Sequence, residues 1–331
     1  MKSLNILMFA TFYPPHSFGG DAIGTQRMAQ ALAARGHQVT VVHDEDAFFN
    51  LGGTAPQGAE PEDGVTRIGL RSGSGVLANL ITQQTGRPLY HAKRLAQIAG
   101  SRDWDIVWYN NVSLVGGPGI MEYGKRAATN GLRIYEAHEH WLVCPSHVLW
   151  RYNKELCDRR ECLRCVLSYR RPPQLWRQTG LLDRELSQID MIIAKSEFSR
   201  AKHAEFGLRH PMTVLPYFLP DLDHSATSPA QHDAPYFLFV GRLEKIKGLQ
   251  DVFPAMDRYP DAELLILGDG DYANELKAMA AHNSRIKFLG RKRPEELAAY
   301  YRGALGLIVP SVCYETFGII LIESFRLGTP V

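Results

Sequence analysis

The stretch FLFVGRLEKIKGLQDVF, residues 237–253, contains the pattern from which the fold can be inferred. Its apolar opening is typical of a buried strand, and the turn Gly241-Arg242 follows directly. The pair Lys247-Gly248 comes next and is predicted to open a helix. A strand, a glycine loop and a helix in this order are typical of an open α/β sheet, in which ligands bind at the carboxyl ends of the strands.

The beginning of the chain has the same arrangement. The strand-like run LNILMFA (4–10) is followed by Gly19-Gly20 and by a helical pattern over 22–36 that closes on Gly36. Strand-like runs then alternate with helical patterns to the end. In the first half they lie at 38–43, 65–70, 105–110, 132–137, 191–196 and 212–216, and in the second at 236–240, 262–268, 285–290 and 305–310. The alternation predicts an α/β fold with parallel sheets in two Rossmann-like domains that face a cleft.

The domain boundaries follow from a change in composition. Residues 220–235, PDLDHSATSPAQHDAP, are polar, contain proline and lack periodicity, as expected of a linker. We predict a first, acceptor-side domain over 1–218, a linker over 219–235 and a second domain over 236–331. The chain stops at Gly328–Val331, where a further strand is expected to begin. The second domain is therefore expected to be truncated.

Composition and charge narrow the function classes. The 331 residues are 45% hydrophobic, which is enough for two cores. Lys and Arg number 37 against 35 Asp and Glu, so a general nucleic-acid binder is not expected. No apolar run reaches the roughly 18 residues of a membrane span. The opening MKSLNILMFATFYPP lacks a small-residue cleavage site and is interpreted as a core strand. We expect a cytoplasmic protein, with peripheral contact at the inner face of the membrane as the alternative.

Three loops of the second half carry features of a phosphate site. Arg242 can hold a diphosphate by a bidentate fork and Lys247 as a point charge. Gly268-Asp269-Gly270 follows a predicted strand. Thr316-Phe317-Gly318 is expected to open a helix whose free N–H groups suit a phosphate. Because all three follow successive strands, they predict a nucleoside diphosphate as ligand. Taken alone, each of the first two would indicate only a solvated turn.

Two glutamates bracket the apolar run in VPSVCYETFGIILIES, residues 309–324. Glu315 precedes the expected helix, and Glu323 falls about two turns later in a helix that is expected to be mostly buried. A buried carboxylate requires a polar partner. Glu323 is predicted to bind the ribose hydroxyls and Glu315 the hydroxyls of an attached sugar. The alternative is an acid near a helix start followed by an exposed one.

These motifs carry a family resemblance. VGRLEKIKG, LGDG, PSVCYETFGIILIES with its E-x7-E spacing and LGTPV together resemble the donor domain of family 4 glycosyltransferases. FYPPHSFGGDAIGTQRMAQALAARGHQVTVV resembles the opening of their acceptor domain. The resemblance covers the chain except for a cysteine-rich segment. It implies a GT-B fold and a hexosyltransferase that retains anomeric configuration without a catalytic metal.

The resemblance also implies residue roles. Arg242 and Lys247 would neutralise the leaving diphosphate, and Glu315 would contact the donor sugar. The remaining donor-site residues would bind the nucleotide or let the backbone approach it, namely Gly19, Gly20, Gly241, Gly268, Thr316, Phe317, Gly318 and Glu323. UDP is favoured as the nucleotide by family frequency, and GDP is the alternative. A cell-envelope polysaccharide is the expected context.

One position departs from the family pattern. Many members have a histidine after the strand that corresponds to DIVWYN, whereas this chain has Asn110-Asn111. His138, after the next strand, matches another histidine that is frequent in the family. We assign it a role at the sugar or acceptor site, with a hydrogen-bonded loop histidine as the alternative.

Four cysteines cluster over residues 138–170 of the first domain. Cys144, Cys157, Cys162 and Cys165 have the spacing C-x12-C-x4-C-x2-C. In a cytoplasmic chain this spacing favours a structural zinc ion over disulfides. A [2Fe–2S] cluster is the alternative metal centre, and two disulfides would be favoured in an exported protein. Cys313 is interpreted as a small buried residue.

The cysteines lie in a basic segment. Residues 151–177 contain eight Lys or Arg and three Asp or Glu, with aromatic residues interleaved. The segment is predicted to bind a glycan or lipid-linked acceptor, or a membrane surface, near residues 150–177. A solvated basic loop around a metal is the alternative.

Other classes of protein fit the sequence less well than a transferase. A Rossmann dehydrogenase is excluded because no strand is followed by G-x-G-x-x-G with an acid about 20 residues later. A nucleotide-sugar epimerase or a phosphorylase on the same fold remains an alternative. A zinc-stabilised nucleic-acid-binding module is a further alternative. The near-neutral net charge counts against it, so no nucleic-acid partner is expected.

Overall fold

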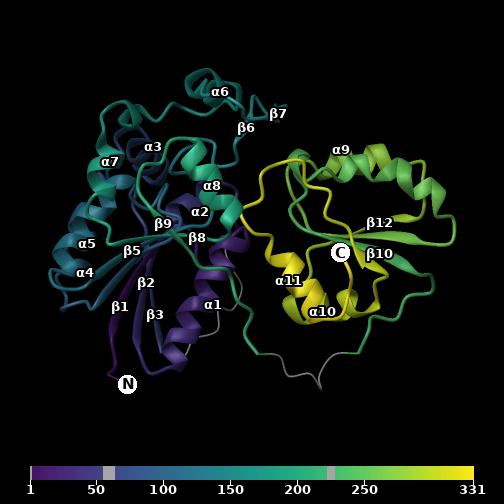
Figure 1. Ribbon diagram of the computed structural model, residues 1–331, viewed down its shortest axis with the longest axis horizontal. Helices are drawn as coiled ribbons and strands as arrows, with labels where there is room; N and C mark the ends of the chain where they lie inside the picture. The colour runs from purple at the N-terminus through teal and green to yellow at the C-terminus, as the bar shows by residue number, and fades with distance from the viewer. Residues whose placement is uncertain (1, 55–63, 222–227) are drawn as a thin grey trace. The chain divides into compact units, whose positions relative to one another are not determined.

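The structure is a computed structural model and describes residues 2–54, 64–221 and 228–331 (Figure 1). It divides into two compact units. The first comprises Met1–Tyr152 and Asp158–Phe218, and the second comprises Asn153–Cys157 and Leu219–Val331. Residues 222–227 of the predicted linker lie outside the described residues.

The first unit contains a seven-stranded sheet in which all paired strands are parallel. The strand order is β3-β2-β1-β4-β5-β8-β9. The strands are β1 (Asn5–Ala10), β2 (Gln38–Asp44), β3 (Val65–Leu70), β4 (Ile106–Tyr109), β5 (Leu132–Ala137), β8 (Met191–Ala194) and β9 (Met212–Val214). Each one coincides with a predicted strand, so the α/β prediction is confirmed for this half. The order reverses between β1 and β4, which places a binding edge at the carboxyl ends of these two strands.

Helices cover both faces of this sheet, with α1 on one side of the strands and α4, α5 and α7 on the other (Figure 1). They are α1 (Gly20–Ala34), α2 (Glu45–Asn50), α3 (Gly75–Thr85), α4 (Ala92–Ala99), α5 (Met121–Ala127), α7 (Leu181–Leu186) and α8 (Glu197–Glu205). The helix predicted over 22–36 is α1. It ends before Gly36, whose φ of +87° suits glycine at the first position beyond a helix.

The cysteine segment forms a small substructure of its own. A hairpin of β6 (Trp150–Arg151) and β7 (Glu155–Leu156) is followed by α6 (Cys162–Ser168). Tyr152 and Asn153 reverse the chain with φ values of +55° and +57°, the left-handed pair that tight hairpins require.

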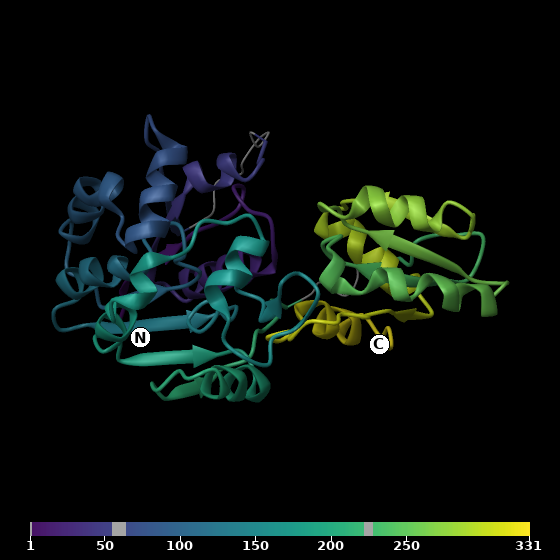
Figure 2. The same cartoon turned by 90° about the horizontal axis from the view of Figure 1, so that it is seen from above.

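The second unit is a four-stranded parallel sheet of order β12-β11-β10-β13. Its strands are β10 (Tyr236–Val240), β11 (Glu263–Leu267), β12 (Ile286–Gly290) and β13 (Gly306–Leu307), and its helices are α9 (Ala273–Ala280), α10 (Pro294–Gly303) and α11 (Ile319–Arg326). Seen from above, helices lie on both sides of these strands (Figure 2). Alternate residues of β11 enter separate cores, since Leu264 and Ile266 face one and Leu265 and Leu267 the other.

Three details of the second unit differ from the prediction. Lys247 and Gly248 do not open an α-helix, because Gly248 is left-handed (φ +67°) and separates the 3-10 turns Lys245–Lys247 and Leu249–Asp251. The helix predicted to begin at Thr316 begins at Ile319, after a left-handed Gly318. That helix is half-buried rather than mostly buried, because only one face, including Ile320, Ser324 and Leu327, packs inward.

Among the described residues, none of the helices combines the length and the apolar character that a membrane crossing needs.

Candidate active site

The strand order of the second sheet reverses at β10, because β11 and β12 lie on one side of it and β13 on the other. Ligands of open α/β sheets bind at the carboxyl ends of the strands at such a point. Lys247 follows β10 and Glu315 follows β13. The Nζ atom of Lys247 lies 2.6 Å from the Oε1 atom of Glu315. The structure thus brings together two residues predicted to contact neighbouring parts of one ligand.

Glu315 accepts further hydrogen bonds within its own loop. The hydroxyl of Ser311 donates to Oε1 at 2.7 Å, and the thiol of Cys313 lies 4.0 Å from the same oxygen. Ser311 was not predicted as a site residue. Cys313 is partly exposed rather than buried, so that prediction was wrong. Its position beside Glu315 follows from the sharp turn of the loop, which residue spacing alone does not reveal.

Charge and burial set the protonation of this cluster. Burial lowers the pKa of Lys247, but the adjacent Glu315 carboxylate outweighs it and the net pKa is raised. The side chain is therefore a fixed positive charge at neutral pH. Burial raises the pKa of Cys313 to about 11, so its thiol is protonated and suited to donate to Glu315.

Arg242 occupies the same edge of the sheet with a more exposed side chain. One of its Nη atoms lies 2.8 Å from a carboxylate oxygen of Glu244, and 50% of its side chain is exposed. Exposed pairs of this kind contribute little to stability. The guanidinium can therefore exchange Glu244 for an anionic ligand at small cost.

The loops after β10 and β11 require glycine at some of their glycine positions but not at all of them. Gly268 has φ +142°, and a Cβ there would lie 1.8 Å from the carbonyl oxygen of Gly241. A Cβ on Gly270 would lie 2.5 Å from the carbonyl oxygen of Leu243. A Cβ on Gly241 would meet only the Phe239 ring, at 3.4 Å. Close packing between the loops after β10 and β11 thus requires Gly268 and Gly270, and Gly241 is not sterically required.

The remaining predicted donor residues of this unit lie around the start of α11. Thr316 and Phe317 belong to the loop, and Gly318 is the N-cap residue. Its carbonyl accepts a bond from the N–H of Leu321 at 3.0 Å. The N–H groups of the first helical turn thus belong to residues 319–321, not 316–318. Glu323 is partly buried in the second turn, and its ribose contact stays a prediction.

His138 lies at the carboxyl edge of the first sheet, directly after β5, and its side chain is fully buried. Its Nε2 lies 3.0 Å from Oδ1 of Asn110, and its Nδ1 contacts the hydroxyl of Tyr217. Because Oδ1 only accepts, Nε2 carries the proton and Nδ1 accepts from Tyr217. Burial, with a further contribution from Lys195, lowers the pKa of His138, which favours this neutral form.

A buried ion pair lies beside His138, whose Nε2 is 3.8 Å from Oε1 of Glu136. Glu136 and Lys195 form it with exposures of 3% and 1%, and Nζ of Lys195 also lies 4.3 Å above the Tyr217 ring. Neither this pair nor Tyr217 was predicted from the sequence. The sequence contained a signal for the ion pair, since Glu136 and Lys195 stand near the carboxyl ends of two strands predicted to be parallel. Such charges are costly to bury unless they are paired.

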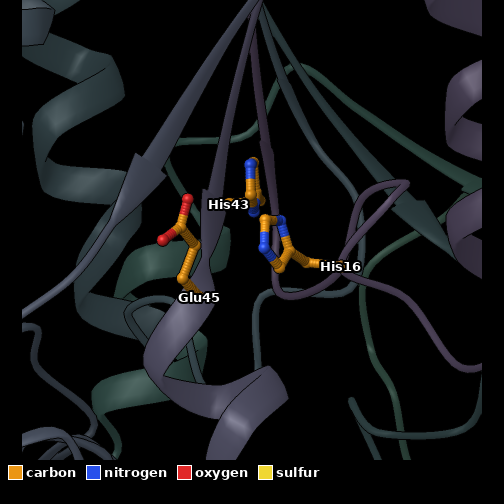
Figure 3. A group of neighbouring side chains, drawn as sticks. All are labelled: His16, His43 and Glu45. Carbon is orange, nitrogen blue, oxygen red and sulfur yellow. The ribbon is translucent and has the colours of Figure 1, made fainter. Parts of the chain in front are cut away.

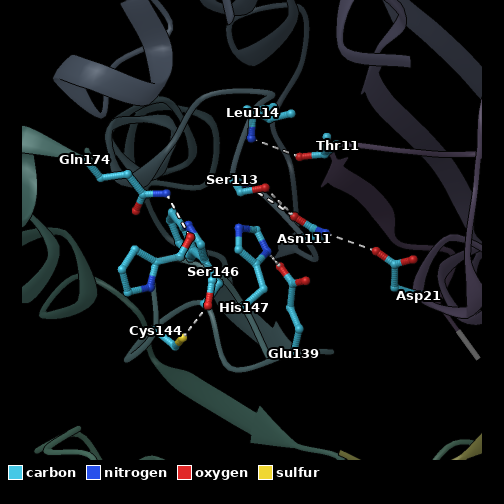
Figure 4. Close-up of polar contacts among 12 residues, drawn as sticks. Thr11, Asp21, Asn111, Ser113, Leu114, Glu139, Cys144, Ser146, His147 and Gln174 are labelled. Atoms are coloured by element: carbon cyan, nitrogen blue, oxygen red, sulfur yellow. Dashed lines mark hydrogen bonds and ion pairs between the residues drawn. The ribbon is translucent and has the colours of Figure 1, made fainter. Parts of the chain in front are cut away.

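The loop predicted to approach the donor is tied to the segment after β4. Gly19 is the N-cap residue of α1 and Gly20 its first residue. The carboxylate of Asp21 accepts a hydrogen bond of 3.0 Å from the amide of Asn111, whose Oδ1 accepts from Ser113 (Figure 4). Asn111 therefore orients the start of α1.

The four clustered cysteines are free thiols. The sulfur of Cys144 lies 3.2 Å from Oγ of Ser146 (Figure 4), and the N–H of Tyr152 donates to the sulfur of Cys165 at 3.4 Å. Over the described residues, sets of three or more candidate metal ligands within 4.8 Å of one another include no cysteine. The zinc and iron–sulfur assignments therefore stay predictions.

Comparisons with known proteins identify the family. The model for "Glycosyltransferase Family 4" matches residues 18–219, and that for "Glycosyl transferases group 1" matches residues 222–331. The chain belongs to glycosyltransferase family 4. The predicted resemblance is confirmed, and this family 4 member is a glycosyltransferase.

Relatives of this family 4 protein include transferases of different names. The glycogen synthase of Mycobacterium tuberculosis is 26% identical over 363 residues, which covers 99% of this chain and 77% of that protein. An uncharacterized glycosyltransferase of Methanocaldococcus jannaschii is 36% identical over 107 residues, or 30% of this chain and 27% of that one.

Solved structures confirm the GT-B fold. Sucrose-phosphate synthase from Thermosynechococcus elongatus matches with a TM-score of 0.70 and 20% identity, covering 99% of this chain and 80% of that chain. Anabaena Alr3699/HepE in complex with UDP and glucose matches with a TM-score of 0.62 and 16% identity, covering 99% and 80%. At these identities the likeness concerns the fold alone.

Proposed function

We propose that this family 4 glycosyltransferase moves a hexosyl group from a nucleoside diphosphate sugar to a hydroxyl acceptor with retention of configuration. The observation that carries the proposal is the contact between Lys247 and Glu315 at the switch point of the second sheet. It supplies a cation for the diphosphate and a carboxylate for sugar hydroxyls side by side.

The chemistry of the leaving group explains the cations. As the bond between the anomeric carbon and the β-phosphate oxygen breaks, negative charge develops on the diphosphate. Lys247 and Arg242 would stabilise that charge. The acceptor oxygen would attack from the same side and transfer its proton to the leaving phosphate. Removing one such fixed charge commonly costs on the order of 3 kcal/mol of transition-state stabilisation.

The structure suggests how the donor would enter. Glu315 forms an ion pair with Lys247. A diphosphate would take over the ammonium, and the released carboxylate oxygen would accept sugar hydroxyls. His138 would then act by holding Asn110 and Tyr217 in place, because both of its ring nitrogens are occupied.

UDP is the nucleotide that we propose, with GDP as the alternative. The complex of Anabaena Alr3699/HepE with UDP and glucose supports the proposal for a protein of the same fold. Glu323 would bind the ribose hydroxyls, which both nucleotides share, so the base has to be tested directly.

We propose that the acceptor is a glycan or lipid-linked molecule of the cell envelope, reached at the membrane surface through residues 150–177. Leu163 and Leu167, one turn apart on α6, are 60% and 55% exposed. The same segment carries exposed arginines at 159, 160, 164, 170 and 171. Apolar side chains among cations suit an anionic lipid surface.

We further propose that Cys144, Cys157, Cys162 and Cys165 close around a structural zinc ion. The spacing and the N–H bond from Tyr152 to the Cys165 sulfur support the site. Such a four-thiolate site would be closed and hence not catalytic. Zinc-edge X-ray absorption of the purified protein should show sulfur ligands, and a visible charge-transfer spectrum would instead indicate [2Fe–2S].

The function is tested by calorimetric titration with UDP, GDP and ADP. We expect one nucleotide to bind, and Lys247→Ala to abolish binding. Lys245→Ala is the matched control, because Lys245 is an exposed lysine on the same 3-10 turn. Equal affinity of both variants would remove Lys247 from the site. Anomeric analysis of the product separates a retaining transferase from an epimerase or a phosphorylase.

A further inference from the structure

Two histidines and a glutamate that have no role in the proposed transfer converge in the first unit. His16 lies in the loop after β1, His43 near the end of β2 and Glu45 at the start of α2. One ligand atom from each lies within 4.8 Å of the other two. Figure 3 shows the His16 and His43 rings next to one another and the Glu45 carboxylate beside them.

The two imidazoles have unused nitrogens. His43 is 3% exposed. In the part of the chain that the structure describes, Nδ1 of His43 and Nδ1 of His16 are buried without a hydrogen-bond partner. A buried polar atom without a partner is costly, and a metal ion is one way of satisfying it.

The sheet register leaves room for the carboxylate. His43 pairs with Gly69 across β2 and β3. A Cβ on Gly69 would lie 1.9 Å from a carboxylate oxygen of Glu45. The missing side chain at Gly69 therefore forms the space that Glu45 occupies beside His43.

Aromatic side chains line the surroundings of His16. The His16 ring contacts the rings of Phe48 and Phe49 with centroids 5.2 and 5.7 Å away. Apolar walls of this kind restrict water around a site. The positive charges of Arg67 and Arg71 are close enough to lower the pKa of His16. The same charges repel a bound metal ion and so weaken its binding. The affinity is therefore expected to be below that of a four-thiolate zinc site.

We propose that His16, His43 and Glu45 bind a divalent metal ion of the zinc class. At metal–ligand distances of about 2.0–2.1 Å, tetrahedral ligand atoms are about 3.3 Å apart. The ligand atoms of the three side chains lie within 4.8 Å of one another, so small side-chain rotations would bring them to that spacing. Two imidazoles and one carboxylate are a common zinc ligand set that leaves a fourth position for water or an anion.

The neighbouring cluster of Asp44, Asp46 and His91 is a weaker candidate. Its carboxylates already accept hydrogen bonds, Asp44 from Ala47 and Asn79 and Asp46 from Ser72. The site at His16 would join the loop after β1 to β2 and α2. Because that loop leads into Gly19 and Gly20, a bound ion would stabilise the entrance to α1.

The test is a titration of the full, chelator-treated chain with zinc chloride, combined with zinc-edge X-ray absorption. We expect one equivalent bound through nitrogen and oxygen, distinct from any sulfur-ligated zinc. His16→Asn and Glu45→Gln should each weaken it more than about 10-fold. Gly69→Ala should also weaken it, because it displaces Glu45. His282→Ala, at an exposed histidine of the second unit, should leave it unchanged.

Circular dichroism in the presence of chelator shows whether each variant folds. His16 and Glu45 are chosen for substitution because both are only partly buried, so their replacement should disturb folding little. The readout is metal binding, so it does not depend on transferase activity. Exclusively sulfur-ligated zinc, or equal affinity in wild type, His16→Asn and Glu45→Gln, would overturn the proposal.

Discussion

The carbonyl oxygen of Pro310 lies 2.0 Å from the position that a Cβ atom would take on Gly248. Gly248 follows Lys247, and Pro310 belongs to the loop that carries Glu315. The two backbones therefore touch at the point where the lysine and the glutamate meet. No other residue type fits there, since Gly248 also has φ +67°.

Gly248→Ala should weaken both folding and nucleotide binding. The left-handed backbone costs alanine about 1–2 kcal/mol, and the clash with Pro310 adds to it by separating Lys247 from Glu315. Gly290→Ala is the matched control, because Gly290 has φ +70° and open space where a Cβ would lie. It should show the backbone cost alone. Urea unfolding and UDP titration of the two variants measure the difference, and equal losses would contradict the role assigned to the contact.

Cys313 should react slowly with alkylating reagents. Burial raises its pKa from 9.0 to about 11, so thiolate at neutral pH is about 100-fold scarcer than for an ordinary thiol. Lys247 lowers this pKa, so Lys247→Met should slow alkylation further.

The pH profile of Cys313 alkylation by iodoacetamide, followed by mass spectrometry of its peptide, measures the effect. The half-maximal rate should fall near pH 11. A short peptide of residues 309–317 serves as reference. The same midpoint in protein and peptide would show that the loop does not shelter the thiol.

Much of the second half could be predicted because its signals are local. Each strand is a continuous apolar run, and a cation or glutamate follows at the carboxyl end, so parallel pairing alone brings Lys247 and Glu315 to one edge. The missed features are non-local. Tyr217 reaches His138 from 79 positions away, and the Glu45 carboxylate occupies the space that the strand register leaves at Gly69, opposite His43. Neither a contact between residues far apart in the chain nor the register of two strands can be obtained from local sequence patterns.

The wrong details have physical reasons too. A helix was predicted to begin at Lys247-Gly248, after the strand and the glycine loop, but the left-handed Gly248 and the proline at the start of Phe253–Arg258 favour 3-10 turns.

His138 should contribute a pH-dependent part of stability. Its pKa, lowered chiefly by burial, is below the unfolded value of 6.5. The stability gained by burying the neutral ring is therefore full above that value and is lost as the pH falls through the folded pKa. His138→Gln should remove this dependence, so wild type should lose more stability between about pH 7.5 and about pH 5.5.

Urea unfolding at the two pH values measures the effect, because the other buried histidines contribute equally to both proteins. His282→Gln, at an exposed position, should retain the wild-type dependence. If His138→Gln loses as much stability on acidification as wild type, the buried ring is not titrating as proposed.

The exposed leucines of α6 should mediate binding to anionic vesicles. Leu163 and Leu167 are 60% and 55% exposed among arginines, so their burial in a lipid interface and the attraction to anionic headgroups act together. Replacing both by serine should reduce co-sedimentation with phosphatidylglycerol vesicles by at least about 10-fold, since each buried leucine contributes about 1.5–3 kcal/mol.

The helix α3 offers a matched control for this experiment. Leu77 and Leu80 are 45% and 41% exposed, but Gly75–Thr85 carries no charged residue. Replacing this pair by serine should leave vesicle binding unchanged, because exposed apolar area without cations does not select an anionic surface. Two results would contradict a lipid surface specific to α6. One is equal binding to neutral phosphatidylcholine vesicles, and the other is an equal loss in the α3 variant.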